Sequence, residues 1–171
     1  MRALIVVFVL GVALGFAVLP AGADEKNDRT GEMDAAARAF VKAYQAKDVD
    51  GMIAVADAPF AIGSLRNPKI MKTNADLRNE LRRRMAPGEP LPTKAMRALT
   101  WDKAITKSLS AEEERRTREQ LKPVMEITGP DGGYSALGDP VGKNKTAMSD
   151  TRLLVGIRDG KAKVLGIVTD R

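Results

Sequence analysis

The residues of this chain that could do chemistry are few, and one pair stands out. Asp57 lies directly before the segment Ala-Pro-Phe, whose proline is expected to end a helix, and Tyr44 lies in the helical pattern that precedes it. An isomerase or cyclase that works through an enolate needs a carboxylate base in an apolar cleft and a donor facing the developing charge. We nominate Asp57 as the base and Tyr44 as the donor for this chemistry. The alternative interpretation is that Asp57 is a solvated residue at a helix end.

The composition excludes several other kinds of site. The 171 residues include no cysteine and no histidine. Thiol catalysis, Ser-His-Asp hydrolysis, Cys-His proteolysis and typical zinc sites therefore have no residues to carry them. We expect no metal site and no cofactor.

The first residues have the pattern of an export signal. Arg2 supplies a positive start, Ala3 to Leu19 is an uninterrupted apolar run, and Ala21-Gly22-Ala23 has the small-x-small form of a cleavage site. We predict cleavage after Ala23 and a periplasmic or extracellular protein with no membrane contact afterwards. The alternative is an uncleaved anchor, because the apolar run approaches the ~20 residues that span a bilayer.

Charge and aromatic content limit the class of partner. The formal net charge is +6, and it becomes +5 once Arg2 is removed with the signal. Such a surface attracts anionic partners. Aromatic residues make up only 4% of the chain, too few for a base-stacking platform, so we expect no nucleic acid.

Hydrophobic spacing predicts helices in the first half of the mature chain. After a flexible lead-in at 24–33, apolar residues recur at threes and fours from Asp34 onward, and Asp48 is placed to cap a second, short helix. Pro59 ends that helix and leads into a strand at 60–65. The elements expected next are a strand at 69–72, a helix that a capping-box-like Thr73 and Asp76 open and that ends at 86–88, and a linker at 89–92.

The second half closes with the clearest pattern in the sequence. Residues 151–158 and 161–170 flank Asp159-Gly160, the favoured pair of a two-residue type I′ hairpin. The elements expected between the two halves are a strand at 93–100, a short helix from Trp101, a charged helix from the Ser110–Glu113 capping box to Leu121, a strand at 123–128 and a mobile loop at 129–150 with one strand near Tyr134. Residues 34–171 are expected to form a single domain.

These elements predict an α+β fold, with N-terminal helices packed on a curved antiparallel sheet. The stretch AFVKAYQAKDVDGMIAVADAPF, 39–60, and the closing hairpin RLLVGIRDGKAKVLGIVTD resemble the nuclear-transport-factor-2-like superfamily, which includes SnoaL-like and ketosteroid-isomerase-like domains. Phe40 and Tyr44 stand on the helix that begins the motif, and Asp48 and Asp50 at its break. The resemblance implies a cone-shaped, cystatin-like domain.

The resemblance also implies a pocket between the sheet and the helices, and a homodimer formed through an exposed sheet face. The side chains we expect to line the pocket are Phe40, Tyr44, Met52, Phe60, Leu153 and Val155. The alternative is that all of them are core residues.

Three functions remain open. The first is a non-catalytic exported domain, structural or binding a small apolar or anionic ligand; the second is the Asp57–Tyr44 enzyme. The third is a basic module for anionic cell-envelope surfaces, carried by arginines on two helices: Arg78, Arg82, Arg83 and Arg84 on one, and Arg115, Arg116 and Arg118 on the other. The alternative for these arginines is a solvated helix face.

Overall fold

A computed structural model describes residues 24–85, 94–95, 98–105, 110–138 and 148–169. The signal sequence expected at 1–23 and the linker expected at 89–92 lie outside these residues. The elements in chain order are α1 (Asp24–Gln45), α2 (Val49–Val55), β1 (Ala56–Ser64), β2 (Pro68–Met71), α3 (Asn74–Arg84), β3 (Lys94–Ala95), β4 (Leu99–Thr100), α4 (Trp101–Ile105), α5 (Ala111–Thr128), β5 (Gly133–Gly138), β6 (Met148–Arg158) and β7 (Lys161–Thr169). The α+β class is confirmed.

One open sheet organises the domain. Its strands follow the order β2-β1-β7-β6-β5-β3, with β4 pairing β5 beside this path. The expectation of an antiparallel sheet is wrong at one pair, because β1 and β7 run parallel, with Ala61 opposite Gly166. The alternation of apolar residues along a strand sets its face but not the direction of its neighbour, so the sequence pattern could not predict this pairing.

Three helices cover the first face of the sheet. Side chains from α1, α2 and α3 meet those of β1, β6 and β7 in a cluster that includes Phe40, Met52, Phe60, Leu77 and Leu153, all with 0% exposure. Asp34 also ties α1 to the segment before β4, because its Oδ1 accepts the backbone N–H of Ala98. This layer is the one that the sequence predicted.

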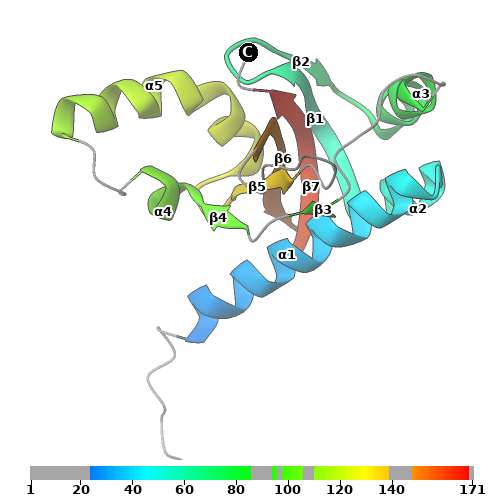
Figure 1. The fold of residues 1–171 in the computed structure, drawn as a ribbon, viewed down its shortest axis with the longest axis horizontal. Helices are drawn as coiled ribbons and strands as arrows, with labels where there is room; N and C mark the ends of the chain where they lie inside the picture. Colours follow the sequence, from blue (N-terminus) through cyan, green and yellow to red (C-terminus); the bar gives the residue numbers. More distant parts are fainter. Residues whose placement is uncertain (1–23, 86–93, 96–97, 106–109, 139–147, 170–171) are drawn as a thin grey trace, which may run out of the picture.

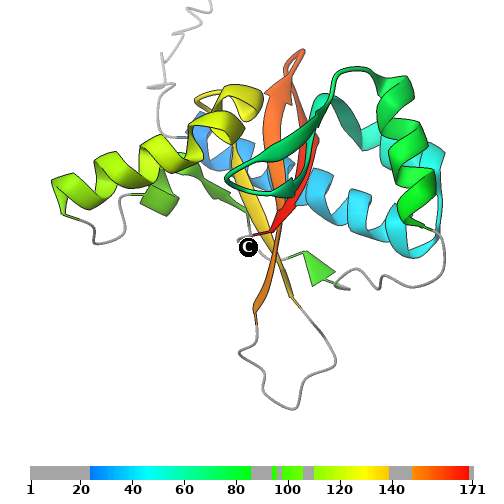
Figure 2. The same cartoon turned by 90° about the horizontal axis from the view of Figure 1, so that it is seen from above.

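Two further helices cover the second face. Trp101 of α4 and Val124 of α5 pack with Ala61, Leu154 and Leu165 of the sheet. The two helices are also joined to each other, because Trp101 Nε1 donates to Thr128 Oγ1 at 2.7 Å. Figures 1 and 2 both show the strands between α5 and the helices of the first layer. The sheet is therefore buried on both faces, whereas the sequence pattern had predicted helices on one face only.

The expected caps are present. Asp48 Oδ1 accepts the Gly51 N–H at 2.9 Å and starts α2, and Thr73 Oγ1 accepts the Asp76 N–H at 3.1 Å at α3. Ser110 and Glu113 form a reciprocal capping box on α5. The helix starts at these three points are confirmed, because side-chain capping is a local interaction that the sequence encodes directly.

The closing hairpin is also confirmed. Asp159 and Gly160 both have positive φ, at 49° and 73°, as a type I′ turn requires. On β7, Gly166 lets three strands approach closely: a Cβ there would lie 2.8 Å from Ala61 O on β1 and 2.8 Å from Leu154 Cδ1 on β6. The turn and this glycine fix β7 in the centre of the sheet.

Several predicted bounds differ from the structure. α1 begins at Asp24 rather than Asp34, and α2 ends at Val55, which places Pro59 inside β1. The strand expected at 93–100 is split into β3 and β4. Within the loop expected at 129–150, the strand predicted near Tyr134 is confirmed as β5, but this segment also contains the start of β6.

The strand expected at 123–128 is wrong, because these residues continue α5 with Pro123 inside the helix. Leu121, Val124 and Ile127 recur at threes and bury one helical face against the sheet. Proline in a helix interior removes a backbone donor and costs about 3 kcal/mol. The burial of this apolar face outweighs that cost, so the helix continues through Pro123.

Leu153 and Leu154 test the two-layer packing with one matched pair. They are adjacent on β6, both have 0% exposure, and they belong to opposite cores. We expect Leu153→Ala and Leu154→Ala each to lower the free energy of unfolding by about 2–5 kcal/mol, measured by urea denaturation. Exposed Lys161→Ala serves as the control, with a change within about 0.5 kcal/mol. A cost below about 1 kcal/mol for Leu154→Ala alone would show that α4 and α5 do not cover the second face.

Candidate functional site

The nominated catalytic carboxylate joins two elements of the backbone. Asp57 is half-buried near the start of β1, where its Oδ1 accepts the Ala58 N–H at 2.9 Å and the Asn74 Nδ2–H at 3.2 Å. Asn74 Oδ1 accepts the same Ala58 N–H at 3.0 Å. These bonds tie β1 to the first residue of α3. The nominated donor, Tyr44, is half-buried on α1 and packs at the edge of the first core.

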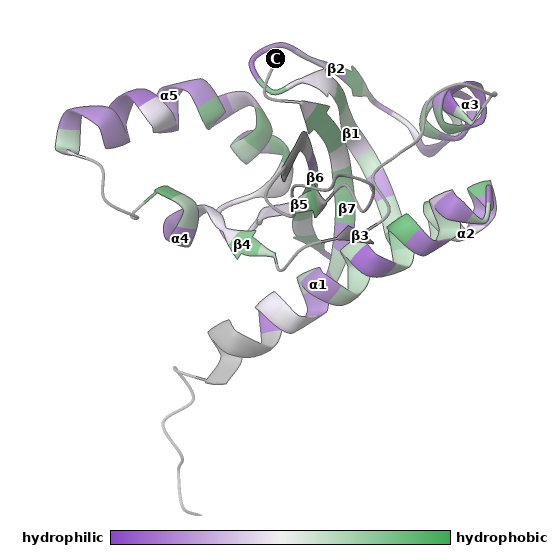
Figure 3. Ribbon diagram, viewed as in Figure 1, coloured by the Kyte–Doolittle hydropathy of each residue, from purple (hydrophilic) through white to green (hydrophobic). Residues whose placement is uncertain are grey.

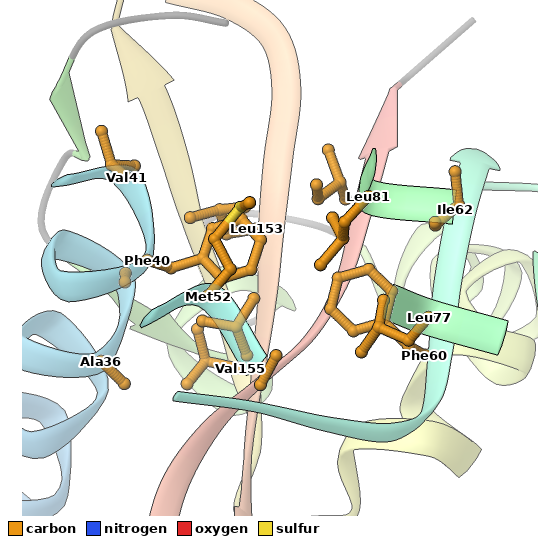
Figure 4. Packing of buried hydrophobic residues seen from close by; sticks show 14 of the residues in the cluster. Ala36, Phe40, Val41, Met52, Phe60, Ile62, Leu77, Leu81, Leu153 and Val155 are labelled. Atoms are coloured by element: carbon orange, nitrogen blue, oxygen red, sulfur yellow. The ribbon is translucent and has the colours of Figure 1, made fainter. Parts of the chain in front are cut away.

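Five of the six nominated pocket residues lie in the first core. Phe40, Met52, Phe60, Leu153 and Val155 have 0% exposure, and the rings of Phe40 and Phe60 stack with centroids 6.3 Å apart. Figure 4 shows these side chains pointing toward one another from α1, α2 and the sheet. Their contacts are those of a hydrophobic core, and a binding role for them stays a prediction.

A surface hollow lies beside this core, between α1, the end of α2 and the β6–β7 turn. Its volume is about 370 Å³. The residues that line it are Glu32, Ala35, Ala36, Ala39, Val55, Gly160, Lys161 and Ala162. Small apolar side chains form most of its surface, while Glu32 and Lys161 supply one acidic and one basic group. We call this hollow the α1 hollow.

None of the residues of the α1 hollow was predicted as a site residue. Part of the signal was present, because Glu32, Ala35, Ala36 and Ala39 recur at threes and fours on one side of α1. The sequence could not show that the β6–β7 turn lies against this side. The position of that turn follows from β7 entering the sheet next to β1.

A second hollow of about 450 Å³ lies along α5. Arg118, Glu119, Lys122, Met125, Glu126 and Pro130 line it. Apart from Met125 and Pro130, these residues are charged. The hollow is formed by one helix and the turn after it, so a ligand there would contact no part of the sheet.

Six of the seven arginines nominated as a basic module are paired with acids on the same or a neighbouring helix, and Arg82 has no ion pair among the described residues. Arg83 and Arg84 contact Glu80 at 2.6 and 3.1 Å, and Arg78 is bonded to Asp50 of α2. On α5 the pairs are Arg115 with Glu112 and Glu119, Arg116 with Glu112, and Arg118 with Glu114. These pairs neutralise most of the charge that the module would need.

The carboxylate at the centre of the α3 pairs is strongly perturbed. Glu80 is only 8% exposed, and its hydrogen bonds from Arg83, and then from Arg84, lower its pKa to about 2 against the opposing effect of burial. On the exposed surface of α5, hydrogen bonds from Arg115 and Arg116 lower the pKa of Glu112 in the same direction. These two carboxylates thus belong to ion-pair networks on helices, whereas hydrogen bonds from Ser110 in the capping box lower the pKa of Glu113.

Neither a metal site nor a membrane span is found among the described residues. No three Asp or Glu side chains of this part of the chain come together in a way that could hold a metal ion. Within the same residues, no helix has the length and apolarity needed to cross a bilayer. Comparison of the chain with protein-family models, curated proteins and solved structures gives no match.

Glu80 makes acid stability testable. Its pKa is lower in the folded protein than the ordinary 4.5, so its ion pairs stabilise the fold fully above pH 4.5, and this contribution is lost as the pH falls toward about 2. A pKa shift of this size corresponds to at most about 3.4 kcal/mol of folding stability. Solvent around Arg83 screens the ion pair, so we expect the Glu80 pairs to contribute about 1–2 kcal/mol to the free energy of unfolding. Glu80→Gln should lose this amount at pH 7 and show a flatter stability profile between pH 5 and pH 2.

Glu119→Gln is the control, because Glu119 is exposed and pairs only with exposed Arg115 among the described residues. Its unfolding midpoint in urea should match that of the wild type at pH 7. Equal, small effects of the two substitutions at every pH would show that the Glu80 pairs do not stabilise the fold.

Proposed function

We propose that the protein is an exported, non-catalytic binding domain of the nuclear-transport-factor-2-like superfamily. The observation that carries the binding role is the α1 hollow, whose volume of about 370 Å³ falls in the range of small-molecule sites. The order α1, Asp48-capped break, α2 and β1, together with the long β6–β7 hairpin, supports membership of the superfamily. The N-terminal export pattern supports a periplasmic or extracellular location.

The chemistry of the α1 hollow suggests the class of ligand. Ala36, Ala39, Val55 and Ala162 offer apolar contacts, and Lys161 on the rim offers a cation with no ion partner in the described part of the chain. A small apolar body with one anionic group satisfies both, and the carboxylate of Glu32 in the same lining disfavours further negative charge on the ligand. Such a ligand would lie between the helices and the sheet, as the resemblance implies, but outside the packed core.

The proposal assigns no catalytic role to Asp57 and Tyr44. The Asp57 carboxylate accepts hydrogen bonds from Asn74 and from the Ala58 N–H. These bonds have a structural role, and the proposal does not treat Asp57 as a base that faces an apolar cleft. A homodimer remains part of the proposal, although α4 and α5 cover much of the second sheet face. The dimer would therefore use another surface.

The ligand class can be tested with anilinonaphthalene sulfonate, an apolar fluorophore with one anionic group. We expect the dye to bind, and Ala39→Trp, which fills the hollow from its exposed side, to weaken binding at least tenfold. Lys161→Glu should also weaken it by removing the cation. Ala75→Trp, on an exposed position of α3 away from the hollow, is the matched control and should bind as the wild type does. Unchanged binding by Ala39→Trp would exclude the α1 hollow as the site.

A native mass spectrum of the protein recovered from its own export compartment tests the rest of the proposal. We expect a chain that begins at Asp24, as a monomer or dimer that retains the mass of a small ligand. A chain that still carries residues 1–23 would contradict cleavage, and a bare chain would contradict a stably bound natural ligand.

A further inference from the structure

One edge of the sheet carries a group of exposed cations with no acid beside them in the sequence. Residues 58–75 contain three cations, Arg66, Lys69 and Lys72, and no acid. All three are exposed, and in the described part of the chain none of their side chains has an ion pair or a hydrogen bond. They surround β2, which is the outermost strand of the sheet beside β1. We call this region, 64–72, the β2 edge.

The β2 edge also exposes an apolar side chain. Ile70, 36% exposed, is the one large hydrophobic residue that lies in the exposed class among the described residues. Register places Ile70 opposite Ala61 and Lys69 opposite Ile62 on β1, so the two side chains point to opposite faces of the edge strand. In Figure 3, β2 contains a green patch next to a purple segment at the margin of the sheet.

Two acids flank this segment in the sequence, and both are engaged in hydrogen bonds. Asp57 is bonded to Asn74 and to the Ala58 N–H. Asp76 accepts the Thr73 hydroxyl at 2.8 Å in the cap of α3. Both carboxylates thus belong to the junction between β1, β2 and α3, next to Lys72, whereas Arg66 and Lys69 are exposed nearer the turn of the β1–β2 hairpin.

We propose that the β2 edge binds an anionic phospholipid surface peripherally. Cations next to such a surface are attracted to the lipid phosphates, each contributing about fivefold in binding. Lys and Arg can hold their charges at the headgroups while their stems lie along apolar material, and an exposed Ile between them enters the boundary of the acyl region. A soluble polyanion would use the three cations equally well but would gain nothing from Ile70, so the combination favours lipid.

This inference differs from the expectation that the mature protein makes no membrane contact. It involves no spanning helix, and it uses residues separate from the α1 hollow. The arginine clusters of α3 and α5 are not required, because their charges, apart from that of Arg82, are already paired. A short edge strand with Lys and Pro is also a known protection against edge-to-edge aggregation, and that role alone predicts no affinity for lipid.

The experiment is co-sedimentation with vesicles of pure phosphatidylcholine and of phosphatidylcholine with about 30% phosphatidylglycerol, a composition that supplies an anionic surface. Every variant is produced as the full chain, so any effect of residues 1–23 is common to all. We expect the wild type to prefer the anionic vesicles. Removing two charges from the β2 edge with Lys69→Ser/Lys72→Ser should weaken binding about 25-fold, and added salt should weaken the wild type further.

The control removes the same charge elsewhere. Lys42→Ser/Lys103→Ser changes two exposed lysines on α1 and α4, and should reduce binding less than threefold. Equal losses in the two double variants would overturn the proposal in favour of a general effect of net charge. Equal binding of the wild type to both kinds of vesicle would overturn it as well.

Ile70 separates a lipid partner from a soluble polyanion. Ile70→Ser should weaken binding to anionic vesicles several-fold and leave retention on a heparin column unchanged. Ile70→Trp should report insertion by a blue shift of its emission on anionic vesicles, against the buried Trp101 as background. If Ile70→Ser binds vesicles as the wild type does, or the emission of the Ile70→Trp variant does not shift, contact with lipid is excluded.

Discussion

The rest of the structure depends on the placement of β7 in the middle of the sheet. This strand pairs in parallel with β1 and antiparallel with β6, so the last described element of the chain joins the first hairpin to the C-terminal strands. Side chains of β7 enter both cores: Val164 and Ile167 face α1–α3, and Leu165 and Val168 face α4 and α5. The spacing of three within each pair reflects the register shift of β7 opposite Leu154 and Val155. Gly166 permits the close approach of Ala61 and Leu154 on either side.

Burial on both faces follows from this arrangement and determines where binding can occur. The interior below α1 is filled by aromatic and aliphatic side chains, so the residues that would line a deep pocket are used for packing. Among the described residues, the places that remain available are at the margins: the α1 hollow beside the β6–β7 turn, the hollow along α5, and the β2 edge. Ion pairing also differs between the helices and the margin of the sheet. Arginines on the helices pair with acids, whereas, within the described residues, the three cations of the β2 edge have no ion pair.

Local features of the sequence predicted much of this fold. The caps at Asp48, Thr73 and Ser110 and the Asp159-Gly160 turn depend on neighbours in sequence, and all four are present. The class of the fold followed from the order of these elements. Pro123 misled the assignment of α5, because the helical spacing of Leu121, Val124 and Ile127 has its effect only when the sheet is there to cover it.

The candidate sites could be predicted only in part, because they too depend on contacts between segments that are far apart in the sequence. Phe40 and Phe60 were predicted to line a pocket, with core packing as the alternative. Both side chains are buried and stack on each other, but apolar periodicity does not distinguish a core from the wall of a pocket. The α1 hollow depends on the contact of α1 with a turn far along the chain, and such contacts have no local signal. The absence of acids from 58–75, by contrast, can be read directly from the sequence. The sequence does not show that these residues form an exposed edge, which follows from the position of β2 as the outermost strand.

Hydrogen exchange followed by mass spectrometry tests the central position of β7 most directly. If β7 joins the two halves of the sheet, the amides of 162–168 should be among the slowest to exchange. They should become exposed only together with those of β1 and β6, in a single global opening. Exchange of β7 that is as fast as that of the exposed first half of α5, or that occurs separately from β1, would contradict the account.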